Sequence, residues 1–173
     1  MKKTYYDWSK AEDLVQDILQ QIQVDKWHPQ FVVGLARGGL LPAVMISHYL
    51  DIPMYSLKVS LRDNSSNDHN ESCHWMARAA CGLDSGTPTN ILIIDDINDS
   101  GNTIKWIKND WRRAEPTNYW PRIWDTLDGN VRIAVLVNNT VSESTVSYSS
   151  VNINKNEEDQ WIVFPWENWW AKL

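Results

Sequence analysis

Blocks of apolar residues separated by polar ones predict alternating helices and strands in the first third of the chain. Apolar positions recur at helical spacing over residues 9–22, with Ser9 placed to cap the helix. The short apolar run at 31–35 is typical of a buried parallel strand. Residues 40–50 predict a second helix, and residues 54–61 predict a second strand.

The same alternation continues further along the chain. Residues 90–94 are the clearest buried strand of the sequence, and residues 102–112 predict the helix that follows it. Residues 131–137 predict another apolar strand, and residues 145–153 alternate as an edge strand does. Strands that alternate with helices predict an α/β fold with a central, mostly parallel sheet flanked by helices.

Three segments do not fit this alternation. Residues 62–74 are polar without an apolar period and predict a long loop. Residues 114–130 contain two prolines and predict an ordered but irregular insertion, and the Trp-rich residues 160–173 close the chain. The length of 173 residues predicts one domain, 1–173, with a core that needs no disulfide or structural metal.

Composition and charge narrow the functional classes. Apolar residues make up 43% and charged residues 22% of the chain, as in an ordinary globular protein. The net charge of -6 argues against nucleic-acid binding, which needs a basic surface. No apolar run approaches the roughly 18 residues of a membrane span, and the first residues lack the apolar core of a secretory signal. The two cysteines fit no metal or disulfide pattern, so we expect a cytoplasmic protein.

Candidate chemistry is concentrated after the apolar strand at 90–94. Asp95 and Asp96 follow it directly, at the carboxyl end of the strand, where ligands bind in open α/β sheets. Such carboxylates accept hydrogen bonds from a ribose diol, or coordinate a Mg²⁺ ion that a phosphate also binds. The pair therefore predicts a site for a sugar phosphate and a divalent cation.

A short polar turn then leads into the next predicted helix. Its residues are Asp99, Ser100, Gly101, Asn102 and Thr103. The glycine lets the backbone approach a ligand closely, the hydroxyls donate hydrogen bonds, and the free N–H groups of the helix N-terminus attract anions. The turn therefore predicts a phosphate cradle. No GxxxxGK[ST] motif occurs, which argues against an ordinary nucleoside triphosphatase.

Residues 95–103, with the four apolar residues before them, resemble the phosphoribosyl pyrophosphate (PRPP) motif of the type I phosphoribosyltransferases. The resemblance implies the fold of that family, with a small hood built from terminal segments, to which residues 138–173 contribute. It also implies PRPP and a nucleobase as substrates and Mg²⁺ as cofactor. By the same resemblance, the turn from Asp99 to Thr103 holds the PRPP phosphate, Asp95 and Asp96 hold the ribose and the metal, and Asp99 accepts a proton from the base.

The loop after the strand at 31–35 resembles the pyrophosphate loop of the same family. Its residues are Ala36, Arg37 and Gly38. An arginine forks onto phosphate oxygens, and a glycine beside it allows the backbone to come close. The resemblance implies that this loop binds pyrophosphate, that Arg37 is catalytic because it neutralises the leaving group, and that a non-proline cis peptide joins Ala36 to Arg37.

The tail at 159–167 resembles the base-binding end of the xanthine-guanine phosphoribosyltransferases. The resemblance implies that Trp161 stacks on the base and that the backbone of Ile162 bonds to its edge. It further implies that Glu167 lies near a water bound to the metal. Family members of this kind, including the hypoxanthine enzymes, act on purines.

The sequence departs from this family at one position that matters. Purine-salvage members place a lysine just after the strand that corresponds to 131–137, where it bonds to the 6-oxo group of the purine. This chain has Asn138 and Asn139 there, and Lys155 lies too far along the chain to be an obvious substitute. An asparagine amide donates the same bond as a neutral group, but it also accepts one from an amino group, so we take Asn138 as the base-binding candidate.

Two functional hypotheses of different classes follow. The first is a salvage enzyme that transfers the 5-phosphoribosyl group from PRPP to a purine such as guanine, xanthine or hypoxanthine and releases pyrophosphate. The alternative is a non-catalytic regulatory protein of the same fold that senses PRPP or a nucleotide. An unrelated sugar-phosphate enzyme on a Rossmann-like sheet is a third reading. The intact set of Arg37, Asp95, Asp96 and Asp99 favours the enzyme.

The resemblance also implies an oligomer, because members of the family are usually dimeric or tetrameric. The chain has 11 tryptophans, and we expect those at 106, 111, 120 and 124 to serve the interface of a homodimer or homotetramer.

Overall fold

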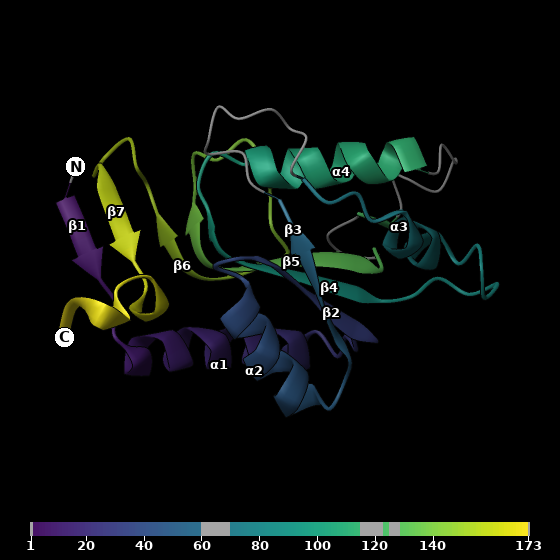
Figure 1. Cartoon of the computed structure of the whole chain (residues 1–173), viewed down its shortest axis with the longest axis horizontal. Helices are drawn as coiled ribbons and strands as arrows, with labels where there is room; N and C mark the ends of the chain where they lie inside the picture. Colours follow the sequence, from purple (N-terminus) through teal and green to yellow (C-terminus); the bar gives the residue numbers. More distant parts are fainter. Residues whose placement is uncertain (1, 60–69, 115–122, 125–128, 173) are drawn as a thin grey trace.

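A five-stranded sheet in which every strand runs parallel to its neighbours forms the centre of the protein (Figure 1). The computed structural model describes residues 2–59, 70–114, 123–124 and 129–172. The strands, in the spatial order β3-β2-β4-β5-β6, are β3 (Met54–Lys58), β2 (Phe31–Ala36), β4 (Ile91–Asn98), β5 (Val131–Asn139) and β6 (Tyr148–Ile153). The predicted α/β fold is confirmed, and residues 148–153 form the edge strand that the alternation indicated.

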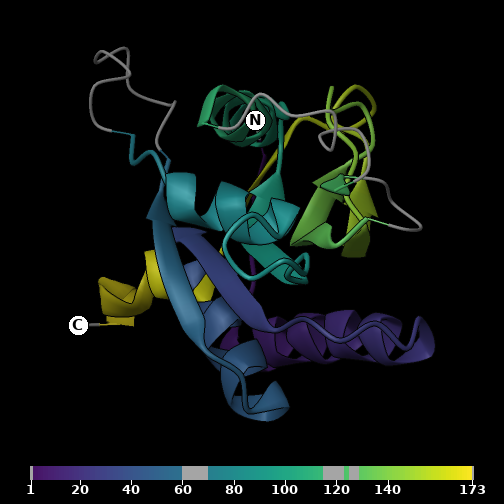
Figure 2. The ribbon, with the colours of Figure 1, turned by 90° about the vertical axis from the view of Figure 1, so that its right-hand side faces the viewer.

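Four helices cover the two faces of this sheet (Figures 1 and 2). Helices α1 (Trp8–Val24) and α2 (Leu40–Leu50) lie on one face, and α3 (His74–Cys81) and α4 (Asn102–Ala114) lie on the other. Each face has its own apolar core. The central strands therefore need apolar side chains on both sides, and this is why their sequences read as uninterrupted apolar runs.

Strand β4 shows how one run supplies both cores. Ile91 and Ile93 point into the core under α3 and α4, while Leu92 and Ile94 point into the core under α1 and α2. All four side chains have no exposed surface. Successive side chains of a strand point to opposite faces, so an apolar run of this length is compatible with only one kind of position, the middle of a covered sheet.

Two local predictions are corrected by the structure. Helix α1 begins at Trp8, and its cap is Asp7 rather than Ser9, because the Asp7 carboxylate accepts the hydrogen bond from the Lys10 backbone N–H at 2.8 Å. Helix α3 was not expected from the sequence. It is only eight residues long, and small side chains such as Ala77 and Ala80 make up much of its buried face.

The predicted loop at 62–74 and the predicted insertion at 114–130 fall largely outside the described residues. Of the first, residues 70–73 are described and lead into α3; of the second, only Ala114, 123–124 and 129–130 are described. Ile123 is buried in the core beneath α4. The irregular character of the insertion therefore stays a prediction.

The two ends of the chain meet in a separate two-stranded sheet. Strand β1 (Lys2–Tyr5) pairs in parallel with β7 (Gln160–Val163), with Lys3 opposite Trp161. Two short 3-10 helices, η2 (Pro165–Glu167) and η3 (Trp169–Lys172), follow β7. Figure 1 shows this hood beside the β6 edge of the central sheet. Strand β6, although it lies within 138–173, belongs to the central sheet.

A buried arginine ties the end of α1 to β5 and β6. Arg132 forms an ion pair with Asp25 at 2.7 Å, donates to the Tyr148 hydroxyl, and lies 4.7 Å from the ring centroid of Trp27. The Tyr148 hydroxyl also donates to Asp25 at 3.1 Å. Burial raises the pKa of Tyr148 to about 12, and the hydrogen bond from Arg132 opposes that rise.

Of the tryptophans expected at an interface, one is fully buried and two are partly buried. Trp111 has no exposed surface, and Trp106 and Trp124 pack against the same core. Trp111 therefore fills the layer between α4 and the sheet, whereas a role of Trp106 and Trp124 in an interface stays a prediction. Trp120 lies outside the described residues. None of the helices in the described part of the chain has the length and apolarity needed to cross a membrane.

Candidate active site

A cavity of about 520 Å³ lies at the carboxyl ends of the central strands. The loop after β2, the end of β4, the start of α4 and the hood all contribute to its lining. The predicted residues that line it are Ala36, Arg37, Gly38, Asp95, Asp96, Asp99, Ser100, Gly101, Asn102, Thr103 and Glu167. The structure therefore brings together the two loops and the terminal acid that the sequence singled out separately.

The conformation of the polar turn at 99–103 is stabilised by a neighbouring loop. Gly101 has a φ of +88°, a conformation that side-chain-bearing residues rarely adopt. The loop at 140–147, between β5 and β6, packs against it: Ser144 Oγ donates to the Gly101 carbonyl at 2.9 Å, and the Glu143 N–H donates to the Ser100 carbonyl at 3.2 Å. Helix α4 begins at Asn102, whose N–H donates to Ser100 Oγ at 3.4 Å, and the first residues of the helix line the cavity.

The carboxylate pair lies on the strand itself and not in a turn after it. Strand β4 continues past Ile94 to Asn98, where it still pairs with β5, so Asp95 and Asp96 occupy its last half. Both are half-buried and line the cavity. The Asp96 N–H donates to the Asp95 carboxylate at 3.0 Å. The pair is therefore fixed by the sheet at the edge where the resemblance required it.

The loop after β2 comes directly against this pair. The peptide bond between Ala36 and Arg37 is cis, as the resemblance implied. A Cβ at Gly38 would overlap the Asp96 carboxylate where it now lies, so the glycine allows this close approach. Arg37 lines the cavity and is exposed to solvent, so its guanidinium can reach an incoming anion.

A second pocket, of only about 10 Å³, adjoins the cavity at the hood. Trp161, Ile162 and Phe164 form its apolar side, and it shares Asp96, Ile97, Asp99 and Glu167 with the larger cavity. One oxygen of Glu167 accepts a hydrogen bond from the Phe164 N–H at 3.0 Å, which caps η2. The residues predicted to hold a base therefore lie beside those predicted to hold PRPP.

Asn138 occupies a different environment from the other base-binding candidates. It lies in register with Asn98 on β4 and with Asn152 on β6. Asn98 donates to its side-chain oxygen at 2.9 Å, and its own amide donates to Asn152 at 3.1 Å. The Asn138 side chain is thus the middle member of a row of hydrogen-bonded amides across three strands. Its role in binding a base stays a prediction.

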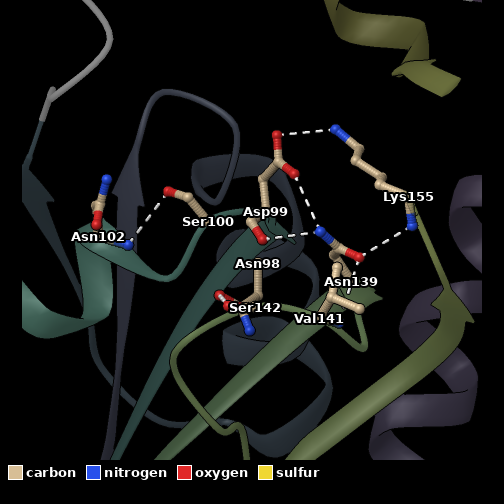
Figure 3. Close-up of polar contacts among 8 residues, drawn as sticks. All are labelled: Asn98, Asp99, Ser100, Asn102, Asn139, Val141, Ser142 and Lys155. Carbon is tan, nitrogen blue, oxygen red and sulfur yellow. Dashed lines mark hydrogen bonds and ion pairs between the residues drawn. The ribbon is translucent and has the colours of Figure 1, made fainter. Parts of the chain in front are cut away.

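Lys155 is the residue of this region that the sequence analysis set aside as too far along the chain. It follows β6, lines the smaller pocket, and its Nζ lies 2.8 Å from Asp99 Oδ2 (Figure 3). The two residues are 56 positions apart in the sequence, so their contact was not expected. The available signal was strand order: residues that follow two neighbouring parallel strands lie at the same edge of the sheet, so the residue after β6 comes beside the residue after β5.

Comparisons with known proteins identify the family to which this chain is similar. The family model described as "Phosphoribosyl transferase domain" matches residues 1–170. The chain is 21% identical to the hypoxanthine-guanine phosphoribosyltransferase of Schizosaccharomyces pombe, over 95% of this chain and 89% of that protein. It is 27% identical to the xanthine-guanine phosphoribosyltransferase of Cereibacter sphaeroides, over 79% of this chain and 68% of that protein.

A solved structure matches the fold over nearly the whole chain. The purine phosphoribosyltransferase from Pyrococcus horikoshii superposes with a TM-score of 0.66 at 24% identity, covering 96% of this chain and 95% of that one. The family model, the relatives and the fold agree with the family that the motifs at 95–103 and 36–38 indicated. This protein is therefore a member of the phosphoribosyltransferase family.

Proposed function

We propose that this protein transfers the 5-phosphoribosyl group from PRPP to a purine such as guanine, xanthine or hypoxanthine and releases pyrophosphate. The observation that carries the proposal is the single cavity lined by the 99–103 turn, the Asp95–Asp96 pair and the Arg37–Gly38 loop. These three features match the three parts of PRPP, namely its 5-phosphate, its ribose diol and its pyrophosphate.

The 5-phosphate is assigned to the 99–103 turn. Backbone N–H groups at the start of α4 and the hydroxyls of Ser100 and Thr103 are donors, and the positive end of the helix favours an anion there. The ribose hydroxyls are assigned to Asp95 and Asp96, because a carboxylate accepts two hydrogen bonds and donates none. The phosphate is thus placed beside hydrogen-bond donors, and the ribose hydroxyls are placed beside acceptors.

The pyrophosphate is assigned to the loop from Ala36 to Gly38. Arg37 presents a planar, positively charged fork of donors that fits phosphate oxygens. As the bond between C1 of the ribose and the pyrophosphate oxygen breaks, negative charge accumulates on the leaving group. A fixed guanidinium stabilises that charge more in the transition state than in the ground state, so it accelerates the reaction.

A Mg²⁺ ion fits the same place. Within the described ranges, no group of three or more His, Cys, Asp or Glu side chains could hold a metal by itself. Mg²⁺ in phosphate-transfer sites is bound by one or two carboxylates together with substrate oxygens and water, and Asp95 and Asp96 supply such a pair. Bound there with Glu167 nearby, it would supply charge neutralisation for the pyrophosphate.

Asp99 is assigned the role of accepting the proton that the base loses. It lines both the cavity and the smaller pocket, so its carboxylate lies between the sites proposed for ribose and base. A ring nitrogen of the base forms the new bond to C1, pyrophosphate leaves with the electron pair of the broken C–O bond, and the N–H proton of the base passes to Asp99. Stacking on Trp161 would hold the base in line for this displacement.

The test is pyrophosphate release from PRPP in the presence of Mg²⁺, followed with and without added base. The proposal predicts release that depends on both a purine and PRPP, with nucleotide and pyrophosphate formed in equal amounts. Release that is independent of base would indicate hydrolysis instead. PRPP binding without any release would favour the regulatory alternative, in which the same fold senses PRPP or a nucleotide.

A further inference from the structure

Asn98, the last residue of β4, is a buried amide that binds the loop at 140–147, and only 3% of it is exposed. Its nitrogen donates to the Ser144 carbonyl at 2.8 Å and to the Asn138 side-chain oxygen at 2.9 Å. Its oxygen accepts a hydrogen bond from the Ser142 hydroxyl at 2.9 Å (Figure 3). The opposite orientation would set the amide oxygen against the Ser144 carbonyl, which has no proton to donate. The fold therefore fixes one orientation of this side chain.

The loop that this amide holds also holds the turn at 99–103. The Gly101 carbonyl accepts a hydrogen bond from the Ser144 hydroxyl at 2.9 Å. The Ser100 carbonyl accepts one from the Glu143 N–H at 3.2 Å. The end of β4 thus binds the loop, and the loop in turn binds the two carbonyls that follow shortly after β4 in the chain.

These two carbonyls determine where two N–H groups of the turn point. The peptide bonds from Ser100 to Asn102 are trans, and in a planar trans peptide the C=O and the N–H point in opposite directions. Because the carbonyls of Ser100 and Gly101 point at the loop, the N–H groups of Gly101 and Asn102 point away from it. Both residues line the cavity. The Asn102 N–H contacts Ser100 Oγ at 3.4 Å, a length beyond the usual range of a hydrogen bond, so it can also serve a ligand.

We propose that Asn98 is a positioning residue for the 5-phosphate of PRPP: it holds the 140–147 loop, and the loop directs the N–H groups of Gly101 and Asn102 towards the phosphate. A glycine adopts many backbone conformations about equally readily, so Gly101 does not by itself favour its φ of +88° and needs this support. Asn98 borders the cavity, but both of its side-chain N–H bonds are used within the protein, so it acts through the loop. This inference rests on the proposed function.

The test compares Asn98→Leu with the matched control Asn130→Leu. Leucine has nearly the shape of asparagine but forms no side-chain hydrogen bond. The Asn130 amide also donates two hydrogen bonds, to the carbonyls of Ala80 and Thr89 at 2.8 and 2.7 Å. It directly precedes β5, however, and therefore lies at the opposite end of the parallel sheet from the cavity.

Three quantities are measured for each variant. Calorimetry gives the affinity for ribose 5-phosphate, which probes the turn, and the affinity for pyrophosphate with Mg²⁺, which probes the loop at Arg37. Urea denaturation gives the free energy of unfolding. A third variant, Ser144→Ala, removes only the hydroxyl that donates to the Gly101 carbonyl, and it decides the question by the same two affinities if Asn98→Leu does not fold.

The proposal predicts that Asn98→Leu lowers the affinity for ribose 5-phosphate by about 10- to 100-fold, the range of one hydrogen bond to a charged group. Its affinity for pyrophosphate should change by less than about threefold. Ser144→Ala should show the same selective loss, and the loss in the double variant should be smaller than the product of the two single losses, because both act through one loop. Asn130→Leu should lose stability but keep both affinities.

Two results would overturn the proposal. One is an affinity for ribose 5-phosphate within about threefold of the wild-type value in Asn98→Leu or Ser144→Ala. The other is an equal loss for ribose 5-phosphate and pyrophosphate, which would mean that Asn98 only maintains the cavity as a whole. Failure of the proposed function looks different: the wild-type protein then binds both ligands but forms no nucleotide from any base, and the comparison still decides the role of Asn98. A wild-type protein that does not bind ribose 5-phosphate would overturn both.

Discussion

Gly101 lies at the point where the phosphate turn and the 140–147 loop touch, so replacing it by alanine perturbs both. Its φ of +88° costs an L-residue about 1–2 kcal/mol. The added Cβ would lie 2.7 Å from the Ser144 backbone nitrogen and 2.8 Å from the Ser142 hydroxyl. A backbone nitrogen cannot rotate away, so the loop itself must shift.

That shift would break the two hydrogen bonds that join the loop to the turn, from Ser144 to the Gly101 carbonyl and from Glu143 to the Ser100 carbonyl. At about 1 kcal/mol for each bond, Gly101→Ala should lower the free energy of unfolding by about 3–4 kcal/mol. Because the turn is the proposed phosphate cradle, its distortion should also weaken PRPP binding.

Gly86 provides a matched control. It also has a positive φ, +76°, but a Cβ there would meet nothing within 4 Å. Gly86→Ala should therefore cost only the conformational part, about 1–2 kcal/mol, and leave PRPP binding unchanged. Urea denaturation followed by tryptophan fluorescence, with PRPP affinity measured by calorimetry, separates the two variants. Equal destabilisation by the two alanines, or wild-type PRPP affinity in Gly101→Ala, would refute this reasoning.

Three further variants test other parts of the molecule. Asp99→Asn should lower kcat by about 10²- to 10⁴-fold while PRPP binding is kept, and unchanged turnover would end its assignment as the proton acceptor. Arg37→Lys should weaken pyrophosphate inhibition by at least about tenfold, since the fork of donors is lost, and an unaltered inhibition constant would contradict the assignment. Tyr148 has its pKa raised to about 12, so its stabilising contribution is complete below pH 10 and is lost as the pH rises towards 12. Urea denaturation at pH 9.5 and 11.5 should show a loss about 1.5–2 kcal/mol larger in the wild-type protein than in Tyr148→Phe, and equal losses would contradict it.

The sheet and its site could be predicted because they depend on local patterns. The run from Ile91 to Ile94 fits only a strand covered on both faces, and in a parallel sheet the residues at its carboxyl end meet those of its neighbours. The polar turn after it and the loop at Ala36–Gly38 were identified separately, each by its own resemblance to a family motif. Their meeting in one cavity follows from the pairing of β2 with β4.

The features that were missed depend on contacts between distant parts of the chain. The polar residues from Asp95 to Asn98 have weak strand propensity, yet β4 includes them because β5 pairs with them. The hood strand β1 exists only through β7, 156 residues away at the hydrogen bond between Thr4 and Gln160. Lys155 reaches Asp99 through the order of β4, β5 and β6, which no spacing in the sequence states.

The central claim is that this chain joins a purine to the ribose of PRPP. The most direct measurement is mass spectrometry of the products formed from PRPP and Mg²⁺ with guanine, xanthine, hypoxanthine, adenine, uracil and orotate, each alone. The structure leads us to expect a mononucleotide from one or more of the three 6-oxopurines and none from the pyrimidines. The absence of nucleotide from every base, in a protein that still binds PRPP by calorimetry, would contradict the claim and indicate a sensor.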